Sequence, residues 1–143
     1  MSKGIIILLS ILYSVQLHAQ DTLLEKKIQL EAFSSFPNEI DGCSCYFSIS
    51  QEKLKKEEYI FVNDFASLAF VKMEGKLIQF ELQNHDKKHK IYYYVHDDYK
   101  MKVEIKMIKK KKTEYETVVV KGIITIESKK GQTKQAFIGD CGC

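Results

Sequence analysis

The 143-residue chain contains no tryptophan, no arginine and only one proline, and each absence excludes a class of protein. Proteins that read nucleic-acid sequence depend on arginine for bidentate contacts to bases, so we expect no nucleic-acid partner. One proline and seven glycines exclude a proline-rich or glycine-rich low-complexity chain. The formal net charge of +3 is close to balance and does not indicate a polyanionic ligand.

The remaining composition is typical of one folded globular domain. Hydrophobic residues make up 45% of the chain and charged residues 29%, which excludes a disordered acidic tail and a long coiled coil. The length corresponds to a single domain on the usual range of about 100–200 residues. A chain of this size buries enough surface for one hydrophobic core.

Residues 1–19 have the order of regions found in a secretory signal peptide. Lys3 supplies a positive charge, an apolar run follows over residues 4–15, and a short polar stretch ends at Ala19. The apolar run is shorter than the roughly 20 residues that a membrane helix needs. We therefore predict cleavage after Ala19, a secreted or periplasmic protein, and no integral membrane span in the mature chain. A retained membrane helix is the alternative.

From Cys43 onward, short runs rich in Val, Ile, Tyr and Phe alternate with turn residues, which is the pattern of β-strands. The expected strands are 43–50, 59–62, 67–73, 77–82, 91–95, 99–108, 115–127 and 134–138, with a polar loop at 83–90. No helical pattern separates them, so parallel βαβ units are not expected. Because an antiparallel meander must protect its edges, residues 42–143 predict an all-β, mainly antiparallel barrel of about eight strands. A two-sheet sandwich is the alternative.

Alternation is clearest in the run from Tyr99 to Ile108. Met101, Val103, Ile105 and Met107 fall on one face of this strand, and charged residues fall on the other. Gly122 lies inside the next expected strand, where a glycine is typical of a bulge or bend.

Residues 20–41 form a separate N-terminal segment. We predict a short helix over Asp21–Phe33, capped by Asp21, although Ile28, Leu30 and Ala32 also alternate as they would in a strand. Residues 34–41, which include Pro37, are expected to be a linker into the barrel.

Four cysteines form two C-x-C pairs at opposite ends of the expected barrel, Cys43 with Cys45 and Cys141 with Cys143. An even number of cysteines in an exported chain indicates disulfides. Paired antiparallel strands keep the sum of residue numbers constant, and this register gives Cys43–Cys143 and Cys45–Cys141. Parallel neighbours would give Cys43–Cys141 and Cys45–Cys143, and bridges within each pair are a strained third option.

The same four cysteines also permit two alternatives to structural disulfides. Four thiolates could bind Zn(II) or Cu(I), although C-x-C is less typical of zinc sites than C-x-x-C. A redox-active dithiol is the remaining alternative.

Two histidine-containing motifs are weaker metal candidates. His85 and His89 have an H-x-x-x-H spacing, which aligns two imidazoles only on a helix, whereas these lie in a lysine-rich loop. His96, Asp97 and Asp98 could bind a hard cation, but the same residues are ordinary in a turn. We therefore predict no metal and no cofactor.

Tyr92, Tyr93 and Tyr94 form the candidate binding surface, with rings expected on both faces of one strand. Exposed tyrosines are common in interfaces, while a core ring with rim rings is the plainer interpretation. The four lysines of 109–112 are expected at a hairpin tip, either solvated or in contact with an anionic lipid or glycan.

No nucleophile elbow, zinc-protease motif or phosphate-binding loop is present, so we do not expect an enzyme. The sequence favours an exported, disulfide-stapled β-barrel that binds an unidentified ligand, as a binder or inhibitor of a protein or glycan. The alternatives are metal binding through the four cysteines and a structural component of the cell envelope.

Overall fold

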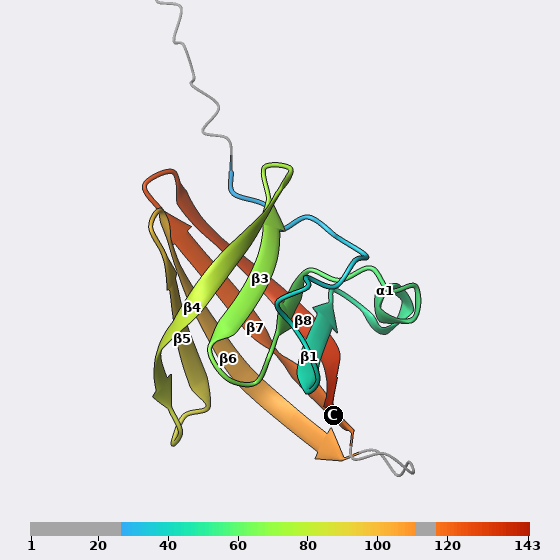
Figure 1. Ribbon diagram of the computed structural model, residues 1–143. Coiled ribbons are helices and arrows are strands. Elements are labelled where there is room, and N and C mark those ends of the chain that lie inside the picture. Colours follow the sequence, from blue (N-terminus) through green and yellow to red (C-terminus); the bar gives the residue numbers. More distant parts are fainter. Residues whose placement is uncertain (1–26, 111–116) are drawn as a thin grey trace, which may run out of the picture.

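The computed structural model describes residues 27–110 and 117–143, which form a closed barrel of eight antiparallel strands (Figure 1). Each strand pairs with the next along the chain, and β8 pairs with β1 to close the wall. The strands are β1 (Ser44–Ser48), β2 (Phe61–Asn63), β3 (Leu68–Met73), β4 (Lys76–Asp86), β5 (Ile91–His96), β6 (Tyr99–Lys110), β7 (Val118–Ser128) and β8 (Gly131–Gly142). The predicted all-β antiparallel barrel is therefore confirmed.

Two strands, β4 and β8, extend well beyond their predicted limits. β4 continues to Asp86 through half of the expected polar loop, and β8 occupies Gly131–Gly142 rather than 134–138. In both extensions, one or both faces of the strand are exposed to solvent, and the residues are mostly polar. A search for hydrophobic runs therefore could not detect these parts of the strands.

The barrel interior is filled by alternate residues of every strand. Phe47, Phe61, Phe80 and Met101 are almost completely buried there. The rings of Phe47 and Phe61 stack with centroids 4.9 Å apart, and Phe137 packs against Phe47 at 4.7 Å. Burying each such side chain contributes about 1.5–3 kcal/mol relative to exposure, so this aromatic centre is a principal source of stability.

The predicted alternation of β6 is wrong beyond Ile105, because the strand contains a bulge there. The register with β7 shifts between Ile105 and Met107, opposite Gly122. Met107 is consequently 39% exposed, and Ile108 takes the inward position opposite Val120. The irregularity predicted at Gly122 is thus present at that level of the sheet, but the extra residue belongs to β6.

Gly122 is needed there because a Cβ atom would contact the carbonyl oxygen of Glu104 and lie 2.6 Å from the ring of Phe137. Its missing side chain allows β6 and β8 to approach β7 closely at the bulge.

The described part of the predicted N-terminal helix, Lys27–Phe33, is extended, so the helix prediction is wrong for these residues. Residues 21–26 lie outside the described part of the chain. Glu31 donates its N–H to the carbonyl of Lys72 at 2.8 Å, and Phe33 exchanges two backbone hydrogen bonds with Tyr59. β2 is only three residues long, so the segment supplies partners that this short strand leaves open.

Ile28 and Leu30 of this segment pack into the interior core, which explains their alternation. Residues farther along the segment cover the outer face of the wall. Phe33 and Ile40 contact an outer cluster that includes Val62 and Phe70. The segment is therefore part of the domain's packing on both sides of the wall.

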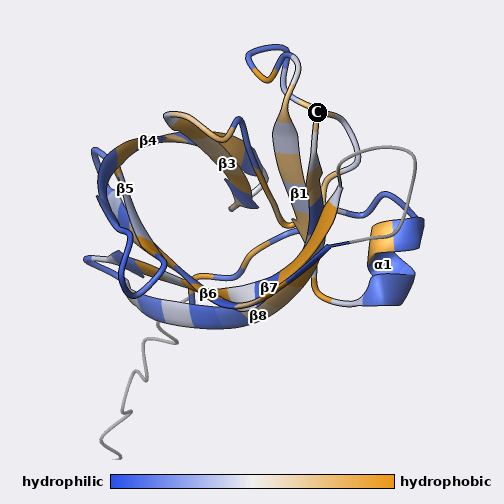
Figure 2. Ribbon diagram, turned by 90° about the horizontal axis from the view of Figure 1, so that it is seen from below, coloured by the Kyte–Doolittle hydropathy of each residue, from blue (hydrophilic) through white to orange (hydrophobic). Residues whose placement is uncertain are grey.

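A short helix that the sequence did not reveal, α1 (Gln51–Lys55), follows β1. The Ser50 hydroxyl caps it by accepting the N–H of Lys53 at 3.2 Å. Leu54 packs against the outer cluster, and Figure 2 places α1 outside the barrel wall. Five residues are too few to display a helical period, which is why pattern analysis missed it.

Candidate binding pocket at the disulfide end

Both disulfides lie at the end of the barrel that holds the C-terminus, hereafter the disulfide end (Figure 1). Cys43 is bonded to Cys143 and Cys45 to Cys141. The strand register pairs Cys45 directly with Cys141, which confirms the pairing expected for antiparallel neighbours. Because the sulfur atoms are bonded to one another, the structure does not support the thiolate metal site.

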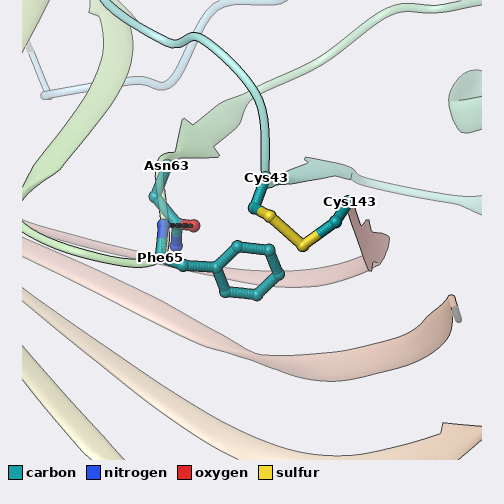
Figure 3. The surroundings of a disulfide bond; sticks show 4 residues. All are labelled: Cys43, Asn63, Phe65 and Cys143. Atoms are coloured by element: carbon teal, nitrogen blue, oxygen red, sulfur yellow. Dashed lines mark hydrogen bonds between the residues drawn. A yellow bond between two sulfur atoms is a disulfide. The ribbon is translucent and has the colours of Figure 1, made fainter.

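The loop between β2 and β3 holds Phe65 beside the Cys43–Cys143 disulfide (Figure 3). Phe65 has a left-handed backbone, with φ of 63°, and its side chain is 52% exposed. The N–H of Phe65 donates to Oδ1 of Asn63 at 3.3 Å. Asp64 holds the rest of the loop, because one carboxylate oxygen accepts the N–H groups of Ala66, Ser67 and Leu68 at 2.9–3.0 Å.

A left-handed conformation is uncommon for a residue with a Cβ atom and carries an energetic cost. The loop therefore keeps a large apolar ring at the barrel mouth, where a turn optimised only for stability would place glycine or asparagine.

Behind Phe65, an apolar pocket of about 160 Å³ opens into the barrel interior. One wall is formed by the Cys45–Cys141 disulfide with Phe47 and Phe61, and the opposite wall comes from β5, β6 and β7. The lining residues are Cys45, Phe47, Phe61, Asn63, Phe65, Ala66, Tyr92, Tyr94, Val103, Ile105, Ile108, Val118, Val120 and Cys141. Ile108 is 51% exposed, so it and Phe65 form an accessible apolar rim.

The three tyrosines predicted as a binding surface are divided between the two faces of β5, as alternation requires. Tyr92 and Tyr94 line the pocket, and Tyr93 lies on the opposite face. Burial raises the pKa of the Tyr94 hydroxyl well above its ordinary value, and a hydrogen bond with Asn63 partly opposes this shift. Tyr94 therefore remains neutral under physiological conditions and adds no charge to the pocket.

Tyr92 is fixed by His85, whose ring stacks on it at 3.9 Å with an interplanar angle of 14°. A register shift between Leu82 and Asn84 in β4 brings His85 directly opposite Tyr92. His89 instead contacts the Asp86 carboxylate at 2.7 Å, and this hydrogen bond lowers the pKa of Asp86. The two histidines of the H-x-x-x-H motif thus have separate partners.

The opposite end of the barrel carries the turns β3–β4, β5–β6 and β7–β8, and is called the turn end. Its cleft of about 740 Å³ has a mixed lining that includes His96, Asp97, Asp98, Glu74 and Lys130. Nδ1 of His96 accepts the N–H of Asp98 at 3.2 Å, which is turn geometry. Within residues 27–110 and 117–143, no three His, Cys, Asp or Glu side chains gather as metal ligands would.

Two further sequence expectations concern the lysine run and a membrane span. Lys109 and Lys110 end β6 in exposed positions, while residues 111–112 of the lysine run lie outside the described part of the chain. In the described residues, no helix is long and apolar enough to cross a membrane.

Comparison with family models, curated proteins and solved structures finds no match to this chain, so its fold and pocket are interpreted from their own geometry.

Proposed function

We propose that the protein is an exported binding module rather than an enzyme, and that the pocket at the disulfide end receives its ligand. The apolar pocket with its two half-exposed rim residues, Phe65 and Ile108, is the observation that carries this proposal. Ligand sites are usually concave and mostly apolar, with a few polar groups. Asn63, Tyr92 and Tyr94 supply the polar side-chain groups of this lining.

Export is supported by two independent features. The first 19 residues have the charged, apolar and polar order of a secretory signal. All four cysteines are joined in disulfides, which persist mainly in oxidising compartments.

The size of the pocket limits what enters it. Its volume of about 160 Å³ is close to that of an engineered apolar protein cavity of about 150 Å³ that binds benzene. Whole drug-sized ligands occupy about 300–1,000 Å³. The pocket therefore accepts one alkyl or aryl group of a larger ligand, and the rest of that ligand lies at the mouth.

This lining favours a hydrocarbon group over a sugar. A buried sugar ring needs hydrogen-bond partners for several hydroxyls, because an unpaired buried hydroxyl costs about 1–3 kcal/mol. The lining offers few such partners, so the glycan alternative receives no support from this pocket.

Benzene is the simplest probe of the proposal. We expect it to shift the NMR resonances of Phe65, Ile108 and Val118 in the mature, oxidised protein, without shifts at the turn end. Ile108→Trp should fill the mouth and abolish these shifts. Ile49→Trp is the matched control, because Ile49 is equally exposed at 51% and lies outside the pocket. Absence of pocket shifts, or equal loss in both variants, would contradict the proposal.

A further inference from the structure

The mouth of the pocket at the disulfide end is bordered by lysines. Lys110 pairs with Val118 across β6 and β7, and Val118 lines the pocket. Lys110 is two residues beyond Ile108, so both lie on the inward side of the strand after the bulge. The next inward position after the rim residue Ile108 is therefore occupied by a cationic side chain, that of Lys110.

A second lysine, Lys90, ends the turn between β4 and β5, and its backbone is bonded to a strand that lines the pocket. The carbonyl of Lys90 accepts the N–H of Ile105 at 3.0 Å, and Ile105 lines the pocket. Lys90 has a left-handed backbone, with φ of 56°, directly before β5, and Tyr92 of β5 lines the same wall. Both Lys90 and Lys110 are exposed, as are Lys87, Lys88 and Lys109 at the same end of the barrel.

Three acidic groups on this side of the barrel are engaged with protein donors. Asp86 contacts His89, and Asp64 accepts three backbone N–H groups of its own loop. Glu104 lies within 3.5 Å of Lys102 and 3.6 Å of Lys106. Among the described residues, the mouth therefore combines an apolar interior with exposed lysines on the side of β6 and the β4–β5 turn, while the exposed Asp41 lies on the side of Cys43.

We infer that the ligand is an anionic amphiphile, specifically a monomeric alkyl carboxylate, and this inference rests on the proposed function. Its alkyl end fills the pocket between the Cys45–Cys141 disulfide and Tyr92. Its carboxylate lies at the mouth, where Lys90 and Lys110 pair with it. Lysine suits this position because its long stem covers apolar surface while its ammonium group stays in water.

The absence of tryptophan from the chain makes a direct assay possible. Phe65→Trp places a single tryptophan at the pocket rim and keeps a large aromatic ring there. Its fluorescence would be titrated with hexanoate, octanoate and decanoate below their micelle concentrations. Affinity should rise about fourfold for each added CH₂ until the pocket is full.

Charge is tested with decanol and decylamine, which have the same alkyl chain. Decanoate should bind more tightly than both. In the Lys90→Gln/Lys110→Gln variant, decanoate binding should weaken about three- to tenfold, while decanol binding is unchanged. Lys129→Gln/Lys130→Gln is the control, because it removes the same charge at the turn end.

The outcomes separate the inference from the proposed function. Equal binding of decanoate and decanol, unaffected by Lys90→Gln/Lys110→Gln, would overturn the anionic ligand and leave the apolar pocket in place. Binding to vesicles of anionic phospholipid without binding of monomeric decanoate would also overturn it. Failure of benzene, decanol and decanoate alike would overturn the proposed function itself.

Discussion

Cys45 on β1 and Cys141 on β8 lie directly opposite each other in the strand pair that closes the barrel, and a disulfide joins them. Cys43 and Cys143 form a second bridge just beyond the end of this pair. The two bridges close almost the same loop, with sequence separations of 96 and 100 residues. They therefore restrict the unfolded chain in nearly the same way.

Removing one bridge should consequently cost much less than removing both. In the chain-entropy model, closing a loop of about 100 residues contributes about 4–5 kcal/mol, and the second bridge adds little to a loop already closed. We expect Cys43→Ser/Cys143→Ser to lose about 1 kcal/mol or less, and the four-serine variant about 4–5 kcal/mol. Denaturant unfolding measures these losses. Equal and additive losses from each bridge would contradict this account.

The observed cysteine pairing was one of three that the sequence left open, and it is the one that antiparallel register gives. The closed barrel decides between them, because it sets β1 and β8 side by side as antiparallel neighbours and extends β8 to include Cys141. The pocket was not accessible from the sequence. It depends on the bulge near Met107, which turns Ile108 inward, and on the backbone of Phe65. Neither feature leaves a periodic signal in the sequence.

Gly139 provides a test of how tightly β8 packs on β1. A Cβ atom here would contact the carbonyl of Tyr46 and the Phe47 ring, with the Phe47 Cα at 2.9 Å. Because two of these contacts are backbone, Gly139→Ala should destabilise the fold by about 2–3 kcal/mol. Ala136→Val adds volume on the exposed face of the same strand and should change stability by less than about 0.5 kcal/mol. Similar unfolding midpoints for the two variants would refute close packing at Gly139.

Ile28 tests whether the N-terminal segment belongs to the domain. Its side chain is 4% exposed within the interior core. Ile28→Ala should lower the free energy of unfolding by about 2–4 kcal/mol. Gln29→Ala, at the exposed neighbouring position, is the control and should have little effect. If Ile28→Ala is as harmless as its control, the segment does not contribute to the core.

The helix predicted for this segment was wrong because local pattern could not identify its partner. Ile28, Leu30 and Ala32 fit a strand as well as a helix, and Asp21 suggested a cap. The open backbone groups of Lys72 and Tyr59 decide in favour of the extended form. Those groups are open only because β2 is short, a property of the assembled barrel rather than of residues 27–33.

Asp86 and His89 provide a pH test at the disulfide end. The His89 side chain hydrogen-bonds the Asp86 carboxylate and lowers its pKa. An NMR titration should therefore place the Asp86 midpoint below the ordinary value of about 3.9. In His89→Ala the midpoint should return upward. A lowered folded-state pKa means that the associated stabilisation is present above the ordinary value and is lost as pH falls. An unchanged midpoint in His89→Ala would exclude this pair as the cause.

The buried Tyr94 hydroxyl should make the free energy of unfolding depend on pH in the alkaline range. Its hydroxyl is buried beside Asn63, and burial raises its pKa above the ordinary tyrosine value. A raised folded-state pKa contributes stability that is fully present below about pH 10 and is lost as the pH rises above it. The free energy of unfolding should therefore fall less steeply above pH 10 in Tyr94→Phe than in the unmodified protein. Tyr93→Phe removes the same hydroxyl from the outer face and is the matched control.

The Tyr94 hydroxyl also provides a link between the pocket and the proposed ligand. If the pocket holds an alkyl chain, ligand binding should exclude more water from this hydroxyl and raise its pKa further. We therefore expect the most resistant tyrosine in a phenolate absorbance titration to disappear in Tyr94→Phe. With decanol bound, whose binding does not depend on charged lysines, it should ionise at still higher pH. A decanol complex in which this titration is unchanged would place the alkyl chain away from Tyr94 and outside the pocket.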